Sequence, residues 1–356
     1  MSDKSRSRIG SPVLHVSVII PFRGDGETLR WVLEGFAGQV LPADVSVEVH
    51  VGGDGCSPPA APPTPTSMPL RFNMRSLPRS GVAGAKNLLL QGLHIDVLIF
   101  VNADTRPDIH FIAAHVSRLL SLPHGSMVLG SAPYESAANK VVLDALKEES
   151  PMVFFYGQLQ PHQYYNYRHA WNLNVSVRGE DLRRVGGFCD ALRPYGYEDL
   201  DFAWRLMGSK AAVYYDPAAV VTHRHPMTLD EYLNREEGLG TVAPVLYRVN
   251  RELFQALFGP RDLDSLAGDY RVWTSMDAPS HRWTYQRLAE WCNLPDSELG
   301  APGSDQRRRL VHTLYQMHIP LKRLAFRLGF LRGLALLDDS KWPQRTSQGL
   351  WKRAIN

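Results

Sequence analysis

The chain has 356 residues, 44% hydrophobic and 21% charged, a composition typical of a globular protein with one large or two smaller domains. Its net charge of +3 is unevenly distributed. Residues 301–356 carry 11 Lys and Arg against 3 Asp and Glu, a balance of +8, which leaves −5 for residues 1–300. A mildly acidic body with a basic tail argues against a dedicated nucleic-acid-binding protein.

The cellular location is predicted from the cysteines and from the N-terminal segment. Cys56, Cys189 and Cys292 lie far apart without a CxxC pair, which favours reduced thiols over a disulfide framework or a zinc site. The N-terminus is polar and lacks the apolar region of a signal peptide. No run approaches the roughly 18 apolar residues that span a bilayer. We therefore expect a cytoplasmic protein, either free or peripheral to the inner face of the membrane.

The N-terminal part of the chain alternates between strand and helix patterns. We predict, in chain order, a strand, turn and helix over 15–39, a strand over 45–55, a proline-rich surface loop over 56–69, a helix over 81–93, a strand over 96–104, a helix over 107–122 with its proline in the first turn, and a strand over 126–134. This alternation predicts an open α/β sheet, which binds ligands at the carboxyl ends of its strands.

The third predicted strand ends in polar residues. The apolar run 97–101 is followed directly by Asn102, Ala103 and Asp104. A Mg²⁺ or Mn²⁺ ion takes hard oxygen ligands and needs only one or two carboxylates when substrate phosphates complete its coordination. Asp104 is thus a candidate metal ligand. The alternative is that it caps the helix predicted to start near Pro107.

Several segments together resemble the family-2 glycosyltransferases of the GT-A fold. They are "VSVIIPFRGDGETL", "VHVGGDGCS", "GVAGAKNLLL", "FVNADTRPD", "GGFCDALRPYGYEDLDFAWRL" and "VVTHRHP", in the order and spacing of that family over roughly residues 15–250. The resemblance implies a Rossmann-like open mixed sheet flanked by helices, with a nucleotide-binding half over 15–134 and an acceptor half over 135–250. Residues 1–14 would be a flexible N-terminus, and 251–356 a helical C-terminal extension.

The resemblance assigns the nucleotide-sugar donor to the strand ends. Asp104 matches the metal ligand of the family's DxD element, in which Asn102 replaces the usual first Asp. Asp54 matches the residue that binds the donor base, although Gly53 departs from the family's Asp at the preceding position. The other residues implied at the nucleotide are Pro21, Phe22, Arg23, Lys86 and Ala103.

The second half of the resemblance supplies catalytic and metal-binding residues. Asp199 matches the general base of inverting members, and Glu198 would position the acceptor. His223 and His225 are two residues apart, so on a strand both face the same side, and the family brings a His from this region to the metal or the diphosphate. Two His with Asp104 also resemble a non-haem iron triad, an alternative that the α/β half disfavours.

Two further regions are predicted with alternatives left open. Trp171, Asn172 and Asn174 resemble the acceptor side of the family's site, although Trp171 could equally be core. The segment 320–337 is a basic amphipathic helix beginning at Pro320. Such a helix either packs on the body with its cations in water or lies on an anionic membrane. The tail could also cover the acceptor site or form a homodimer.

The function expected from these features is inverting sugar transfer from a nucleotide-diphosphate sugar, of the UDP or dTDP type, with Mn²⁺ or Mg²⁺ as cofactor. The acceptor could be a glycan, a lipid-linked sugar, a peptide or a small molecule. A nucleotidyltransferase is the first competitor, but "PFRGDGET" is a poor phosphate-binding loop. A sugar-binding module with a decayed site is the second, kept open by Gly53 and Asn102.

Overall fold

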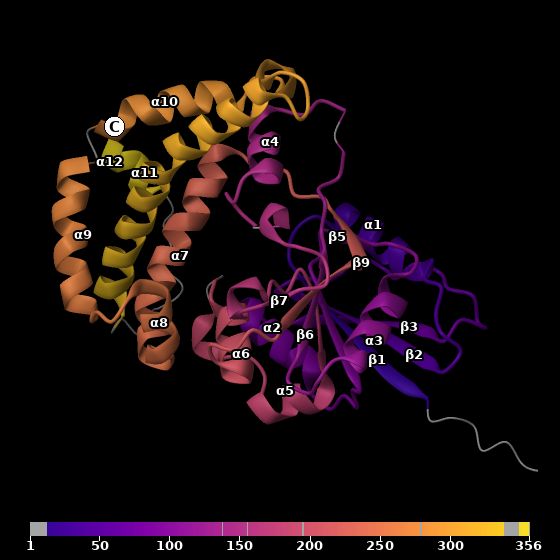
Figure 1. The fold of residues 1–356 in the computed structure, drawn as a ribbon. Helices are drawn as coiled ribbons and strands as arrows, with labels where there is room; N and C mark the ends of the chain where they lie inside the picture. Colours follow the sequence, from indigo (N-terminus) through magenta and orange to yellow (C-terminus); the bar gives the residue numbers. More distant parts are fainter. Residues whose placement is uncertain are drawn as a thin grey trace, which may run out of the picture.

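The computed structural model describes residues 13–136, 138–154, 156–193, 196–277, 280–337 and 349–355 (Figure 1). Its strands are β1 Leu14–Phe22, β2 Val45–Asp54, β3 Leu70–Leu77, β4 Val97–Val101, β5 Thr105–Pro107, β6 Met127–Ser131, β7 Tyr164–Tyr165, β8 Asn174–Arg178 and β9 Val213–His223. Its helices are α1 Gly26–Ala37, α2 Gly81–Leu90, α3 Phe111–Ser121, α4 Val142–Glu149, α5 Gly179–Val185, α6 Glu198–Met207, α7 Leu229–Val249, α8 Arg251–Phe258, α9 Leu263–Asp277, α10 His281–Cys292, α11 Asp305–Leu336 and α12 Leu350–Ile355.

The strands of the described part form one mixed sheet in the order β3-β2-β1-β4-β8-β6-β9-β5, with β7 paired to β9. β1 runs parallel to β2 and β4, whereas β8 is antiparallel to both β4 and β6. The predicted open mixed α/β sheet is therefore confirmed. Because the parallel strands β1, β2 and β4 are neighbours, their carboxyl ends lie at one edge, as the site prediction requires.

Helices cover both faces of the sheet. Side chains that alternate along β1 separate two apolar clusters, with Ile19 packing toward α2 and α6 and Ile20 packing toward α1 and α3. Helix α1 follows its predicted pattern. Asp25 caps it by accepting the backbone N–H groups of Glu27 and Thr28, and its apolar face is fully buried at Leu29, Val32, Leu33 and Phe36.

β3 lies in a segment for which no element was predicted, because an edge strand with one exposed face carries no continuous apolar run. Two local predictions are wrong. Pro107 belongs to β5, and α3 starts at Phe111 with His110 at the cap position, so Asp104 caps no helix there. Helix α11 starts at Asp305 and contains Pro320 in its interior.

A helical layer formed by α7 to α12, together with α4, lies beside the sheet (Figure 1). Helices α7 and α11 approach each other closely at glycines. A Cβ added to Gly329 would lie 1.9 Å from the carbonyl oxygen of Glu237, and one added to Gly240 would lie 2.0 Å from that of Phe326. Burial of both halves of α11 thus outweighs the roughly 3 kcal/mol that a proline costs inside a helix.

The packing interpretation of the 320–337 segment is the one the structure supports. Leu321, Leu324 and Phe330 are buried, while Arg327 stacks on Trp273 with 4.6 Å between the guanidinium carbon and the ring centroid. Its apolar face is thus used inside the protein, which removes the reason for placing this helix on a membrane. Among the described helices, none is both long and apolar enough to cross a bilayer.

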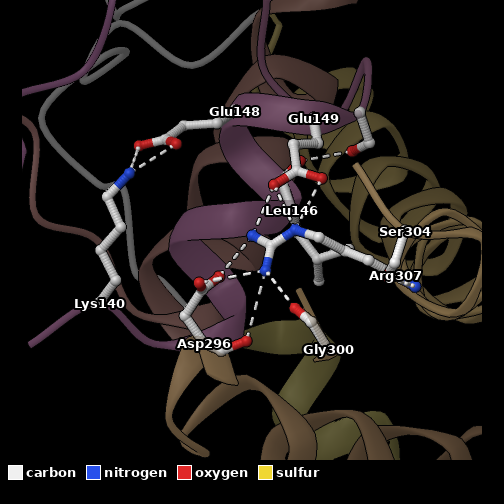
Figure 2. A network of polar contacts seen from close by, with 9 residues as sticks. Lys140, Leu146, Glu148, Glu149, Asp296, Gly300, Ser304 and Arg307 are labelled. Atoms are coloured by element: carbon white, nitrogen blue, oxygen red, sulfur yellow. Dashed lines mark hydrogen bonds and ion pairs between the residues drawn. The ribbon is translucent and has the colours of Figure 1, made fainter. Parts of the chain in front are cut away.

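A buried arginine fastens α11 to the rest of this layer (Figure 2). The Arg307 guanidinium donates to Glu149 Oε1 at 2.6 Å and to Asp296 Oδ1 at 2.7 Å, and it also reaches the Gly300 carbonyl. The α4 helix, the 296–300 turn and α11 therefore share one ion cluster. It lies outside the cavity described next.

Candidate active site

One cavity of about 1520 Å³ lies between the carboxyl edge of the sheet and helix α7. The predicted residues that line it are Pro21, Phe22 and Arg23 at the end of β1, Asp54 at the end of β2, Lys86 on α2, Asn102, Ala103 and Asp104 after β4, Trp171 and Asn172 before β8, Glu198 and Asp199 on α6, and His225 after β9. His223 is buried directly behind this wall and contacts Asp104. The fold thus gathers into one space residues that span more than 200 positions of sequence.

Asp104, His223 and His225 form a cluster that could hold a metal ion. His225 Nδ1 lies 3.0 Å and His223 Nε2 3.5 Å from Asp104 Oδ2, and one ligand atom from each residue falls within 4.8 Å of the others. Antiparallel pairing of Thr105 with His223 brings the turn after β4 to the end of β9. The pairing of β5 with β9 therefore builds this cluster from segments about 120 residues apart.

Unpaired atoms show that this cluster fits a cation. The buried Asp104 Oδ1 and His223 Nδ1 have no hydrogen-bond partner among the described residues, which is costly unless a ligand satisfies them. Burial alone would raise the pKa of Asp104, but hydrogen bonds from the two imidazoles outweigh it and lower that pKa. The carboxylate is therefore held as an anion, the form that binds metal.

Aromatic stacking orients the two histidines. The ring of Tyr134 lies parallel to that of His223 at 5.1 Å, and His223 in turn stacks on His225 at 5.1 Å. The backbone of Tyr134 also forms a bridge to His223. Tyr134 thus packs behind the metal cluster, a role that no pattern in the sequence indicated.

Lys86 joins the two carboxylates of α6. Its Nζ lies 2.7 Å from Asp199 Oδ1 and 3.4 Å from Glu198 Oε1, and its side chain is 3% exposed. Burial disfavours the ammonium, but the two carboxylates outweigh this effect and raise the pKa of Lys86. Lys86 is thus paired with both carboxylates, and it also lines the cavity in which the nucleotide is predicted to bind.

The two carboxylates differ in their surroundings. Glu198 is fully enclosed, and burial, together with the nearby Asp199 carboxylate, raises the pKa of Glu198 to about 7. Its Oε2 accepts the Gly196 N–H at 3.1 Å. Asp199 keeps 27% of its side chain exposed toward the cavity, and its Oδ2 accepts the Asn172 N–H at 3.1 Å. Asp199 is thus the carboxylate that a ligand can reach.

Asn172 and Trp171 continue this wall. The Asn172 side chain is buried, and both its amide nitrogen and its oxygen lack a hydrogen-bond partner among the described residues. A buried amide that faces a cavity without partners is typical of a group that binds a ligand. Trp171 packs against Phe154 at 5.2 Å and Tyr156 at 5.0 Å between ring centroids. It therefore packs in the core and also lines the cavity.

Two predicted residues have structural partners. Asn174 does not line the cavity. Its amide nitrogen donates to the carbonyls of Ser131 and Ala219, and its oxygen lies 2.7 Å from His115 Nε2, so it fixes the strands beneath the site. Asp54 lines the cavity, but its carboxylate accepts the backbone N–H groups of Ser80 and Gly81 at the start of α2.

The wall formed by α7 is the largest feature that the sequence did not indicate. Glu231, Asn234, Arg235, Leu239 and Val242 of this helix line the cavity. They lie outside the motifs, and an amphipathic pattern does not reveal which side of a helix faces a ligand rather than the core. The sequence of α7 therefore indicated only that it is helical, and not that it lines a cavity.

The sequence is similar to those of two curated glycosyltransferases. The "Pre-mycofactocin glycosyltransferase" of Mycobacterium tuberculosis, in strains CDC 1551 and H37Rv, is 27% identical over 247 residues, covering 65% of this chain and 48% of the relative. The chain thus spans about half the length of these relatives. The predicted resemblance to glycosyltransferases is confirmed by this match, and no protein-family model matches the chain.

Two solved structures align with the chain at weak similarity. The mannosyltransferase PcManGT from Pyrobaculum calidifontis, in complex with GDP-Man and Mn²⁺, aligns over 91% of this chain and 87% of its own with a TM-score of 0.47 and 16% identity. S. aureus TarS 1–349 aligns over 88% of this chain and 90% of its own, with a TM-score of 0.41 and 14% identity. Likenesses at these TM-scores are too weak to define function.

Proposed function

We propose that this chain, similar to curated glycosyltransferases, transfers a sugar with inversion from a nucleotide-diphosphate sugar to an acceptor hydroxyl, assisted by a divalent metal. The observation that carries this proposal is the shared cavity, which contains the Asp104 cluster on one wall and the reachable carboxylate of Asp199 on another. Sugar transfer needs both groups in one space, because the diphosphate leaves on one side of the anomeric carbon as the acceptor attacks on the other.

The donor is assigned to the strand edge. Pro21, Phe22 and Arg23 would line the nucleotide, with the exposed Arg23 available to phosphate. Asp54 would approach the base while it also caps α2. Arg79, next to the start of α2, lines the same part of the cavity and adds a cation suited to a diphosphate. A UDP or dTDP donor remains the prediction from the Asp54 carboxylate.

Asp104, His223 and His225 would hold the metal. One carboxylate with two imidazoles suits a first-row transition ion, because imidazole binds such metals better than it binds Mg²⁺. We therefore favour Mn²⁺. When bound, the ion would neutralise negative charge that develops on the departing diphosphate.

Asp199 would act as the general base. It accepts the proton of the acceptor hydroxyl, and such assistance typically contributes roughly 10²–10⁴-fold. The Lys86 ammonium and the Asn172 backbone N–H hold its two oxygens, so its orientation is set before the acceptor binds. Glu198, whose pKa is raised to about 7, carries a proton for much of the time near neutral pH, which reduces repulsion between the two neighbouring carboxyls.

The test is a thermal-shift and donor-hydrolysis series. Mn²⁺ with UDP, dTDP or GDP sugars should raise the melting temperature of the full chain, with one nucleoside class giving the largest shift. Asp104→Ala should lose the shift caused by Mn²⁺ alone, whereas the exposed Asp44→Ala should keep it. Equal Mn²⁺ shifts in the two variants would remove the metal assignment, and a wild type that responds to no nucleotide sugar would overturn the function.

A further inference from the structure

The far end of the cavity, beneath α7 and α8, presents Leu239, Val242 and Leu257 beside polar groups that the protein itself engages, and this chemistry limits the acceptor. We infer that the acceptor carries its hydroxyl beside an apolar body, rather than being a fully hydroxylated glycan. This inference rests on the proposed function, since it assigns a substrate class to the same cavity.

The residues of helix α7 that line the cavity change from polar to apolar along the helix. Its first cavity-lining residues, Glu231, Asn234 and Arg235, are polar and follow closely after His225 of the metal cluster. Its later ones include Leu239 and Val242, and Leu257 of α8 continues the same surface. With a rise of about 1.5 Å per residue, Glu231 and Val242 are roughly 16 Å apart along the helix. The polar and apolar ends of the cavity are therefore well separated.

The start of α6 forms the opposite wall at this end. A Cβ added to Gly196 would lie 2.5 Å from Leu239 Cδ2, so the backbone at Gly196 packs against the Leu239 side chain. Tyr197 adopts a positive φ of 67°, rare for a residue with a side chain, and its ring lies edge-on to that of Phe258 with 6.2 Å between the centroids. This backbone immediately precedes Glu198 and Asp199. The apolar end is thus joined directly to the proposed base.

Polar groups at this end are already engaged with the protein. The Thr241 hydroxyl donates to the Glu237 carbonyl at 2.9 Å. Glu237 Oε2 accepts the Leu350 N–H at 2.8 Å, and Arg332 lies 3.9 Å from Glu237 Oε1. A glycan acceptor would bring a hydroxyl on nearly every carbon, and those left unpaired on burial would each cost affinity.

A single hydroxyl, by contrast, finds partners beside the base. The unpaired amide of Asn172 lies next to Asp199, whose carboxylate is the reachable one. An acceptor with its hydroxyl held there would extend its body over Leu239 and Leu257, which are half-buried and line the cavity. Such a body would cover apolar side chains that otherwise face water in the cavity. The gain in binding free energy increases with the apolar area removed from water.

The experiment compares acceptors that differ only in their apolar part. Methyl and octyl glycosides of one sugar present the same free hydroxyls on apolar parts of different size. We expect kcat/KM for the octyl glycoside to exceed that for the methyl glycoside at least about tenfold, the lower range for differences in an apolar pocket. Leu239→Asn and Leu257→Asn, both nearly isosteric, should reduce this preference.

The controls separate this inference from the proposed function. Leu120→Asn, on an exposed part of α3, should keep both the octyl preference and donor hydrolysis without acceptor. If the wild type hydrolyses the donor but uses the methyl glycoside as well as or better than the octyl glycoside, the apolar acceptor is refuted while the proposed sugar transfer stands. Unchanged preference in both cavity variants would also overturn it. Absence of donor binding and hydrolysis in the wild type would instead refute the proposed function.

Discussion

Replacing Lys86 by Met removes the only cation found within 4 Å of Glu198 and Asp199 among the described residues, while keeping an unbranched apolar stem. At 2.7 Å and an effective dielectric constant of about 20, the attraction between Lys86 Nζ and Asp199 Oδ1 is about 6 kcal/mol. The variant does not lose all of this, because a carboxyl of the pair can bind a proton instead.

Protonation sets the upper limit of the loss. Protonating a carboxyl of ordinary pKa near 4 costs about 1.4 kcal/mol per pH unit, hence about 4 kcal/mol at pH 7. Because Asp199 keeps some contact with solvent, we expect Lys86→Met to lower the free energy of unfolding by about 3 kcal/mol at pH 7, in the range for breaking a buried ion pair. The folded-state pKa of the carboxyl is then above its unfolded value, so the loss grows as pH rises and falls to about 1 kcal/mol at pH 5.

Urea unfolding at pH 5 and pH 7, followed by circular dichroism, measures this difference. The matched control is Lys140→Met, because Lys140 bonds to Glu148 at 2.8 Å with both side chains about one-quarter exposed (Figure 2). It should cost less than about 1 kcal/mol at either pH. Equal losses in the two variants, or a Lys86→Met loss that does not change with pH, would refute the reasoning.

Three further outcomes are expected. Asp199→Asn should keep donor binding in thermal shift but lose transfer by about 10²–10⁴-fold; retained turnover would place the base elsewhere. Burial raises the pKa of Glu198 from 4.5 to about 7, so wild-type stability from this group is present below pH 4.5 and lost toward pH 7. The free energy of unfolding of Glu198→Gln, measured by thermal unfolding, should therefore rise by up to about 3 kcal/mol relative to wild type between pH 4.5 and pH 8. The same pH dependence in the two proteins would contradict the burial of Glu198. Arg307→Met should lower the free energy of unfolding in urea by about 1.5–3 kcal/mol, because the buried guanidinium loses its charged hydrogen bonds while Glu149 and Asp296 keep contact with water; a change under about 1 kcal/mol would show that the cluster is dispensable.

The sheet half was readable from the chain because its signals are local. The apolar runs of β1, β2 and β4 and the amphipathic face of α1 depend on side-chain periods of about two and about four residues. Acidic and amide residues that directly follow such runs must come to the carboxyl edge of parallel strands. Asp54, Asn102 and Asp104 lie at the ends of predicted strands, so this rule places them at that edge, and the cavity includes them.

The distant partners could be decided only by the tertiary structure. Lys86 meets Glu198 across 112 residues, and the direction of a side chain on a helix is fixed by what the helix packs against, not by its own sequence. Pro320 lies inside α11 because burying both halves of the helix stabilises it by more free energy than the proline costs. Sequence rules consider only that local cost. Local periodicity thus determined the strands and their polar ends, whereas long-range packing determined which charges meet and which side of α7 faces the cavity.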